Sequence, residues 1–577
     1  MNSSELAIGI DLGTSTSILS VLRDGKPFAI PDPQTKTPIV PSVVGLNRRG
    51  ELEAGQAALN AVTDPTRLIR EAKRAMGTST TFQLGQHTLR AEEVAALVLR
   101  KMAAVGESYL GVPVRKAVIT VPAYFGDLER RATLRAAELA GIGAIRLISE
   151  PVAAAAAFGL DNHSFEGTVL VFDMGGGTLD VTLLEMIEGV LEVKASHGDK
   201  HLGGKDIDEI LMNHALAEFR REHPGAEPSQ AAMERLKRAA ESAKKMLSES
   251  EVADIVVENF AAHEGDVAEL CVTVERRQFE SLIRPLIDRA IQTVDQTLDK
   301  AGASKGDIDR LLLVGGATYI PAIREAVVRH IGKPALSGVD PDLAVSQGAA
   351  ISAGLALGTL DSTREQTVAI VDSNTHGIGV RVLHIEEYDA YPTYDELIAP
   401  NTPIPYFTKR MYSLLRPDQT ELEMHVFQDV RNTKVLEDCV PTGVSGVITD
   451  IPPALYGEPH KVEVEFSYDQ NHIVQIKATV VGVGKSTTVR LHADELSQSD
   501  EEMAQAARNI DQLWQSSPLA KTNEKLIERA QTAIREGHPK GELIEALVVE
   551  LKTKISANDA EGVRATRQKL VDVLAEV

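Results

Sequence analysis

The chain has 577 residues, of which 83 are acidic and 60 are Lys or Arg, so its formal net charge is −23. Such a charge disfavours nucleic acid and anionic membranes as main partners, because both bind basic surfaces. The two cysteines, Cys271 and Cys439, lie far apart in sequence and exclude a disulfide framework and a cysteine-rich metal site.

The first residues, Met1 to Leu6, lack the basic and apolar segments of a secretory signal. The longest apolar run, Val152 to Phe158, is much shorter than the ~20 residues of a membrane helix. We therefore expect a cytoplasmic protein with no membrane partner.

Residues 1–360 alternate short apolar runs with helical patterns, which is typical of an α/β domain. A polar stretch then precedes Val368–Asp372, and we interpret residues 361–372 as a linker with a short apolar segment. The expected strands of the α/β region are residues 6–10, 117–121, 168–172 and 311–314, and its expected helices include 91–104 and 127–140.

Residues 373–493 lose the helical pattern and show period-two alternation between proline-rich turns, which predicts an antiparallel β-sandwich. Residues 494–577 are charged and helical. Ser499 and Glu502 form a capping box there, and apolar residues recur from Met503 to Trp514 at helical spacing. We expect a small helical bundle. The expected strands of the sandwich are residues 420–427, 461–468, 473–480 and 486–491.

Two segments of the first 360 residues share one plan, in which an apolar strand is followed by Asp, Gly and Thr and then by a second strand. They are Asp11–Thr14 and Asp173–Thr178. Glycines let backbone N–H groups approach phosphate oxygens, threonine donates to phosphate, and aspartate holds Mg²⁺ through its waters. Either turn alone is equally a glycine hairpin with a capping aspartate. The pair predicts two lobes that clamp a triphosphate and its metal.

A third strand and glycine turn, Leu313–Thr318, precedes a helix that begins at Pro321. The glycine pair would let a flat base or ribose approach the backbone, although strand-to-helix packing explains it as well. Gly484–Ser486 resembles the end of a P-loop, but it joins two predicted strands and is interpreted as a hairpin turn.

With these turns in order, the chain resembles the DnaK-type seventy-kilodalton heat-shock chaperone family. Gly9–Ser15 is similar to its first phosphate signature, Val171–Asp180 to the second and Leu313–Pro321 to the adenosine signature. The resemblance also includes Ala117–Arg130 and Ile148–Ala155, and it covers nearly the whole chain. The length and the segment Lys73–Gly77 are most similar to the shorter bacterial HscC-type members.

The resemblance implies an actin-like ATPase domain of two lobes, a peptide-binding sandwich and a helical lid, with ATP or ADP and Mg²⁺ as cofactors. Lys73, Glu150, Asp173 and Thr178 would serve catalysis, and Asp11 and Asp173 would organise the metal. The implied nucleotide-binding positions are Asp11, Gly13, Thr14, Ser15, Gly175, Gly176, Gly177, Gly203, Gly204, Glu241, Lys244, Lys245, Ser248, Gly315, Gly316, Tyr319 and Asp342.

Taken singly, these residues have plainer interpretations. Lys73 is equally a solvated helix charge, and Glu150 before Pro151 is equally an acid at a helix N-terminus. Glu241 and Lys244 are equally an (i, i+3) surface pair.

In the sandwich, the resemblance implies that an extended apolar peptide binds at Tyr412, Leu415, Leu422 and Met424. Leu422 and Met424 are equally sandwich core. Val368–Asp372 stands at the position of the family's interdomain linker, and Pro122 and Arg130 match its interdomain relay. Several positions depart from the family pattern: Thr16, Tyr319 and Lys205 near the nucleotide, an Ala in the linker and an insertion at His384–Asp395.

The sequence thus predicts a chaperone that binds and releases unfolded polypeptides in a cycle of ATP hydrolysis, in the manner of a heat-shock and stress-response protein. A J-domain co-chaperone is the implied partner, while the short hairpin at Ala262–Val272 argues against the usual nucleotide-exchange factor. One alternative is a nucleotide-binding but uncoupled peptide-binding module. A small-molecule kinase of the actin-like fold is another, although it leaves some 200 residues of sandwich and lid without a role.

Overall fold

The structure is a computed structural model. It describes residues 6–62, 64–161, 165–187, 190–263, 266–360, 369–386, 389–454, 457–469, 474–483, 485–490, 500–518, 522–535, 538–556 and 560–575. Residues 361–368 of the expected linker, Gly484 of the expected hairpin turn and Ser499 of the expected capping box lie outside these ranges.

The N-terminal part of the chain forms a mixed sheet. In spatial order its strands are β11 (Gly143–Ser149), β10 (Lys116–Val121), β1 (Ile8–Leu12), β2 (Thr16–Arg23) and β3 (Lys26–Ala29), and β4 (Val40–Pro41) pairs with β2. β1, β2 and β3 form an antiparallel meander, and β10 and β11 add in parallel on the other side of β1. We call residues 6–161 the first lobe.

A second sheet repeats this plan. In spatial order it consists of β17 (Arg310–Val314), β12 (Gly167–Met174), β13 (Leu179–Ile187), β14 (Val190–Asp199) and β18 (Ala369–Val371). β12, β13 and β14 are an antiparallel meander, and β17 adds in parallel beside β12. We call residues 165–343 the second lobe. The repeated strand, turn and strand of the sequence therefore starts the meander of each sheet.

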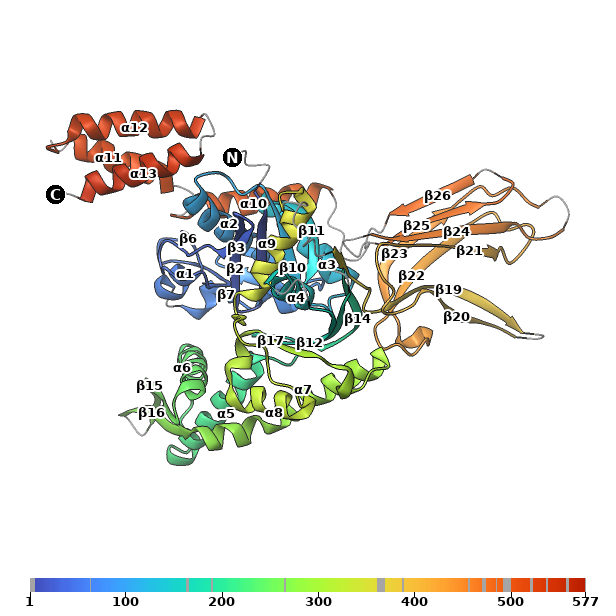
Figure 1. Ribbon diagram of the computed structural model, residues 1–577, viewed down its shortest axis with the longest axis horizontal. Coiled ribbons are helices and arrows are strands. Elements are labelled where there is room, and N and C mark those ends of the chain that lie inside the picture. The colour runs from blue at the N-terminus through green and yellow to red at the C-terminus, as the bar shows by residue number, and fades with distance from the viewer. Residues whose placement is uncertain are drawn as a thin grey trace.

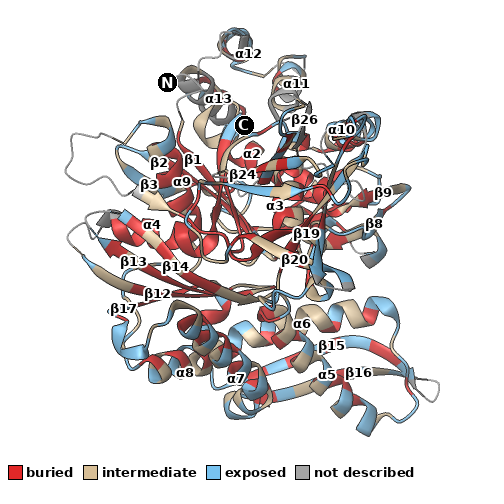
Figure 2. Cartoon of the chain, turned by 90° about the vertical axis from the view of Figure 1, so that its right-hand side faces the viewer, coloured by how far each residue is buried: buried red, intermediate tan, exposed pale blue. Residues whose placement is uncertain are grey.

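Helices and sheets alternate in layers (Figure 1). α4 (Glu150–Asp161) and α9 (Ala344–Leu357) pack between the two sheets, where alanines allow close approach. α2 (Ala91–Leu110) and α3 (Asp127–Ala140) cover the outer face of the first sheet. The outer face of the second sheet is covered by α5 (Gly204–Glu222), α7 (Arg276–Ala301) and α8 (Pro321–Ile331). Figure 2 shows the sheet strands buried at the centre of these layers.

Smaller elements extend each lobe at its periphery. In the first lobe a short 3₁₀ turn, η2 (Ala72–Ala75), lies in sequence between a three-stranded sheet and a hairpin, and it contacts α2. In the second lobe, α6 (Gln230–Glu249) packs on the hairpin β15–β16, which contains the segment that the sequence marked as short. The remaining bounds are β5 (Val43–Leu46), β6 (Leu52–Ala54), α1 (Gln56–Ala61), β7 (Leu68–Arg70), β8 (Thr81–Leu84), β9 (His87–Arg90), β15 (Val252–His263) and β16 (Asp266–Glu275).

The expected β-sandwich is present, and it consists of two four-stranded sheets. The alternation of residues 461–468 is confirmed, because Val462, Val464, Phe466 and Tyr468 are all buried in its core. One sheet runs β20 (Asp389–Ile398), β19 (Gly377–Glu386), β22 (Leu422–Asp429) and β23 (Val440–Ile448), and the other runs β21 (Tyr406–Ser413), β24 (Lys461–Tyr468), β25 (Val474–Val480) and β26 (Lys485–Arg490). The insertion at His384–Asp395 lies in the hairpin β19–β20, of which residues 387 and 388 are outside the described ranges.

The expected small helical bundle at the C-terminus is formed by the last three described helices, and the helix before them does not belong to it. α11 (Thr522–Arg535), α12 (Gly541–Ser556) and α13 (Ala560–Ala575) share one apolar core, but α10 (Asp500–Ser516) packs on the first lobe. Ile510 and Leu513 join the core beneath α2, and the Arg100 guanidinium donates to Asp511 over 2.6 Å. The apolar face of α10 therefore points to another domain, which helical periodicity alone does not reveal. None of the described helices is both long and apolar enough to cross a membrane.

The apolar part of the expected linker is a strand. Ala369, Ile370 and Val371 pair in parallel with Val190, Leu191 and Glu192 of β14. This short segment completes the second sheet, and it leads directly into the first strand of the sandwich.

Candidate functional site: a cleft between the two lobes

The two glycine turns of the sequence face each other across a cleft with an empty volume of about 540 Å³. The sequence suggested that Asp11 and Asp173 directly follow strands. In the structure both aspartates lie within strands, because β1 extends to Leu12 and β12 to Met174. A Cβ atom placed on Gly176 would lie 2.0 Å from the Ser15 Oγ, which means that the turns of the two lobes are packed against each other.

The cleft brings together most of the residues that the sequence singled out as nucleotide-binding or catalytic. Thr16, Val314, Pro341 and Val345 line it too, and the candidate positions did not include them. The predicted residues in its wall are Asp11, Gly13, Thr14, Ser15, Lys73, Glu150, Asp173, Gly175, Gly176, Gly177, Thr178, Gly315, Gly316 and Asp342.

Three carboxylates, those of Asp11, Asp173 and Glu150, converge in the cleft. The Lys73 Nζ lies 2.7 Å from the Glu150 Oε1, and both side chains are buried. Burial, and then repulsion from Glu150, raise the pKa of Asp11 to about 7. The same two causes raise the pKa of Asp173 well above its usual range. The single positive charge of Lys73 therefore does not neutralise the three carboxylates of this cluster.

These carboxylates fit a magnesium ion bound through its water shell. Among the described residues, no group of three or more acidic, histidine or cysteine side chains is arranged to hold a metal directly. Mg²⁺ commonly keeps several waters and takes only one or two carboxylates together with phosphate oxygens. Two acids whose ionised forms are destabilised by burial and by repulsion from Glu150 would gain from such a cation.

Glycines leave the wall of the cleft free of side chains where a ligand would meet the backbone. At Gly175 a Cβ would meet no atom within 4 Å, so the backbone there is open to the cleft. Gly315 has a φ of 81° and its Cβ would lie 2.5 Å from the Met174 carbonyl oxygen, so only glycine fits between β17 and the second turn. The walls thus fit a phosphate chain and the nucleoside that follows it.

The other predicted nucleotide-binding residues are not among those that line this cavity. Gly204 N donates to the Gly175 carbonyl over 3.0 Å, so the Gly203–Gly204 turn lies directly behind the second glycine turn. On α6, Glu241 forms an ion pair with Lys245, four residues away, and not the expected pair with Lys244, three residues away. Lys244 instead lies 2.7 Å from Asp208, and Ser248 donates to the Lys244 carbonyl. Tyr319 is 47% exposed and donates to Asp340.

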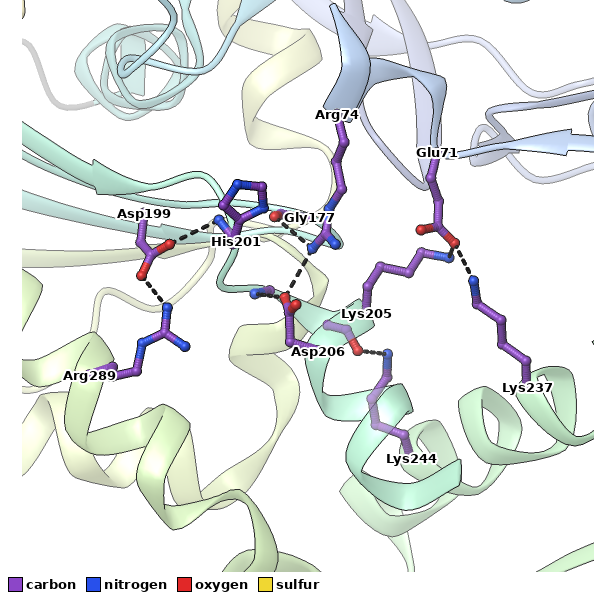
Figure 3. A network of polar contacts seen from close by, with 12 residues as sticks. Glu71, Arg74, Gly177, Asp199, His201, Lys205, Asp206, Lys237, Lys244 and Arg289 are labelled. Atoms are coloured by element: carbon purple, nitrogen blue, oxygen red, sulfur yellow. Dashed lines mark hydrogen bonds and ion pairs between the residues drawn. The ribbon is translucent and has the colours of Figure 1, made fainter. Parts of the chain in front are cut away.

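A polar network links the lobes beside the phosphate turns (Figure 3). The Arg74 Nη2 donates to the Gly177 carbonyl and to Asp206, each over 2.9 Å. Glu71 in the first lobe lies 2.9 Å from the amines of Lys205 and Lys237 in the second lobe. These two lysines hold the pKa of Glu71 at about 2, against the opposing effect of burial.

Sequence reasoning missed Glu71, Arg74 and Asp180. Glu71 directly precedes η2, and Arg74 follows Lys73 on it, so a search around the candidate lysine would have included them. Asp180 pairs directly with Asp173 across β12–β13, and burial together with Glu150 raises the pKa of Asp180 to about 7. The spacing of two aspartates around a tight turn was the available signal, because like charges opposite one another in a hairpin are unfavourable.

Of the predicted peptide-binding residues, Tyr412 lies on the edge strand β21, while Leu422 and Met424 lie on the inner strand β22 of the other sheet. Tyr412, Leu422 and Met424 are half-buried against the core, whereas Leu415 is 53% exposed. The Tyr412 hydroxyl donates to Asp395 over 2.6 Å, which joins the edge strands β20 and β21 of the two sheets. Leu422 and Met424 are therefore partly core, as the plainer interpretation had it, and Tyr412 is partly core as well, whereas the Leu415 side chain is exposed.

The sandwich contacts the first lobe through the loop after β10. The Thr375 hydroxyl donates to the Ala123 carbonyl over 2.7 Å, and the Tyr124 hydroxyl donates to the Val430 carbonyl over 3.1 Å. Arg130 is fully buried beneath this contact and faces Asp372. These contacts and β18 connect the cleft-forming lobes to the sandwich.

Comparison with known families agrees with this arrangement. A family model described as Hsp70 protein matches residues 7–577, from β1 to the last residue. The match includes both lobes, the sandwich and all four C-terminal helices α10 to α13. It does not identify the HscC-type subtype, which stays a prediction. The chain belongs to the Hsp70 family.

Proposed function

We propose that this protein is an ATP-dependent molecular chaperone, which binds and releases extended apolar segments of unfolded polypeptides as it hydrolyses ATP. Membership of the Hsp70 family supports a chaperone role, ATP binding and ATPase activity. The observation that carries the proposal is the joint presence of a cleft with facing phosphate turns and a strand, β18, that ties its sheet to the sandwich.

The proposal divides the chain as its composition suggests. Residues 1–360 are the actin-like ATPase domain, 361–372 the interdomain linker, 373–493 the peptide-binding sandwich and 494–577 the helical lid. The duplicated sheet plan supports the first assignment, because two equivalent lobes clamp a nucleotide between equivalent turns. The packing of α10 on the first lobe supports a lid that is held away from the sandwich.

In the cleft, Asp11 and Asp173 would hold the hydrated Mg²⁺ of the nucleotide, and the glycine turns with Thr14, Ser15 and Thr178 would bind its phosphates. Bound Mg²⁺ neutralises phosphate charge during transfer to water. Lys73 lies beside the Glu150 carboxylate and places a positive charge where negative charge develops on the terminal phosphate. Glu150 orients a water molecule and accepts its proton, for which a buried carboxylate beside an ammonium group is suited.

In the sandwich, Tyr412, Leu415, Leu422 and Met424 bind apolar side chains of a client in extended conformation. Sandwich edges accept an extended peptide through main-chain hydrogen bonds, and alternate side chains then enter apolar pockets. The partners are unfolded polypeptide clients and, from family membership, a J-domain co-chaperone.

Dissociation of a fluorescent apolar peptide from the full-length protein tests the proposal. We expect much faster release in Mg-ATP than in ADP. Equal release rates from a protein that binds both ligands would contradict the coupled cycle and would favour an uncoupled peptide-binding module. The variant Asp173→Asn is the control, because its release rate should not respond to Mg-ATP.

A further inference from the structure

A buried histidine lies where the sandwich meets the first lobe. His376 follows β18, directly before the first sandwich strand, and only 2% of it is exposed. Its ring stands edge-on against the ring of Tyr124, with 4.6 Å between the centroids and 83° between the planes. Since Tyr124 belongs to the first lobe, this contact exists only while the sandwich is docked.

The docked His376 ring is suited to the neutral form. It shares a hydrogen bond with the backbone of Tyr124, but its Nε2 is buried and has no hydrogen-bond partner among the described residues. A neutral imidazole tolerates one unbonded nitrogen as an acceptor. A protonated ring carries an N–H on both nitrogens, so one donor would be buried without an acceptor.

The charged groups around the ring add to this preference. Lys200 after β14, Lys300 on α7 and Arg130 on α3 are the cations that act on His376. Together with burial they lower the pKa of His376 to about 3.

Two further groups act through Tyr124. The His197 ring on β14 lies 5.5 Å from the Tyr124 ring, and its Nδ1 lies 3.0 Å from the Lys300 Nζ. The Asp180 carboxylate on β13 accepts a hydrogen bond from Tyr124 N and so lies beyond Tyr124. The charged groups with the largest effect on His376 are thus the cations Lys200, Lys300 and Arg130. The buried carboxylate of Asp429, whose residue is paired opposite Gly377, accepts from Thr433 N and Lys434 N.

We propose that His376 makes domain docking sensitive to protons, so that mild acid releases the sandwich from the first lobe. The inference rests on the proposed function only in its consequence, which is that acid would hold the chaperone in the undocked, slowly releasing form. The contact between the sandwich and the first lobe is itself observed in the structure.

The direction of the pH dependence follows from the difference in the pKa of His376 between the docked and undocked forms. In the undocked form the ring meets water and has an ordinary pKa of about 6.5. The docked form keeps the neutral ring, so the contribution of His376 to docking is complete above pH ~6.5 and is lost as the pH falls below that value. Between pH 7.5 and 5.5 the ratio of docked to undocked protein should fall about tenfold.

Small-angle X-ray scattering of the full-length protein, without nucleotide and in Mg-ATP, measures the docked fraction at both pH values. The wild type should show the tenfold fall, and His376→Leu should show less than a twofold change. His376→Gln, a neutral polar variant, is a second test in case leucine disturbs folding. Its ratio of docked to undocked protein should also be insensitive to pH. His214→Leu on α5, remote from the sandwich, should behave as the wild type.

An unchanged ratio in the wild type, or an equal fall in both His376 variants, would overturn the inference. Peptide release at pH 7.5 separates it from the proposed function. If Mg-ATP fails to accelerate release there, the coupled cycle is wrong, while scattering without nucleotide still decides the role of His376.

Discussion

The Lys73 ammonium lies 2.7 Å from the Glu150 carboxylate in the cleft, and both groups are almost completely removed from solvent. The pair shares its site with Asp11 and Asp173, whose ionised forms Lys73 also stabilises. The lysine therefore has two roles, which substitution should separate. It compensates the charge of the carboxylates in the cleft and stabilises developing charge during hydrolysis.

Replacing the lysine, in Lys73→Met, should reduce ATP turnover about 10²–10³-fold, the usual cost of losing one preorganised charge at a reacting centre. It should also lower the melting temperature without nucleotide, since three carboxylates then share the site without a cation. Single-turnover hydrolysis and thermal unfolding measure the two effects. The double variant Lys73→Met, Glu150→Gln should recover stability but not turnover, and a Lys73→Met protein with wild-type turnover would contradict the assignment.

The contact of Glu71 with Lys205 and Lys237 should slow nucleotide release, because it must break when the lobes separate. Partly buried pairs of this kind contribute about 1 kcal/mol, so Glu71→Gln should release ADP about fivefold faster. Stopped-flow displacement of a fluorescent ADP measures the rate. The same change at exposed Glu249, at the end of α6, the helix that carries Lys237, is the control and should have no effect. Equal rates for Glu71→Gln and wild type would show that the contact does not limit opening.

The close packing of the two phosphate turns predicts unequal effects for neighbouring glycines. Gly176→Ala forces the Ser15 side chain away and should lower the stability of the nucleotide-free protein by about 1–3 kcal/mol. Gly175→Ala meets no atom within 4 Å and should leave that stability unchanged. Denaturant unfolding compares the two, and Ser15→Gly should rescue Gly176→Ala. The packing of the turns would be disproved by a Gly176→Ala protein as stable as the Gly175→Ala protein.

The raised pKa of Asp11, about 7, predicts a gain of stability on neutralisation. A carboxyl whose pKa is higher in the folded than in the unfolded protein opposes folding as it ionises, so its cost grows from pH ~4 to pH ~7 and persists above. Asp11→Asn should therefore stabilise the nucleotide-free protein at pH 8, by an amount on the order of a few kcal/mol, and much less at pH 4.5. It should bind Mg-ATP poorly. Thermal melts at both pH values test the sign, and a loss of stability at pH 8 would reverse it.

The sequence allowed the prediction of elements that depend on local pattern. The alternation over residues 461–468 matches β24 residue for residue, and Asp127–Ala140 matches α3. The paired glycine turns could be recognised because the residues that approach phosphate must recur in each lobe. These features depend on neighbours in the chain.

Features that depend on distant partners were not predictable in the same way. The apolar face of α10 gives no sign of whether it packs on α11 or on the first lobe, and it packs on the first lobe. Glu71 and Lys205 are 134 residues apart, since 205 − 71 = 134, and neither is conspicuous alone. His376 looks like any histidine near a strand until Tyr124 is beside it.

The three residues of β18 have a consequence for solubility. They pair with Val190, Leu191 and Glu192 at the outer edge of β14, so loss of β18 would leave the backbone groups of these three residues unpaired. Open edges invite pairing with other chains. Part of the protection is already in β14, where Lys194 bonds Glu185 and Glu192 and places charges along the strand. The linker therefore also guards against self-association, and a chain cut or mutated there should aggregate more readily than one altered elsewhere on the surface.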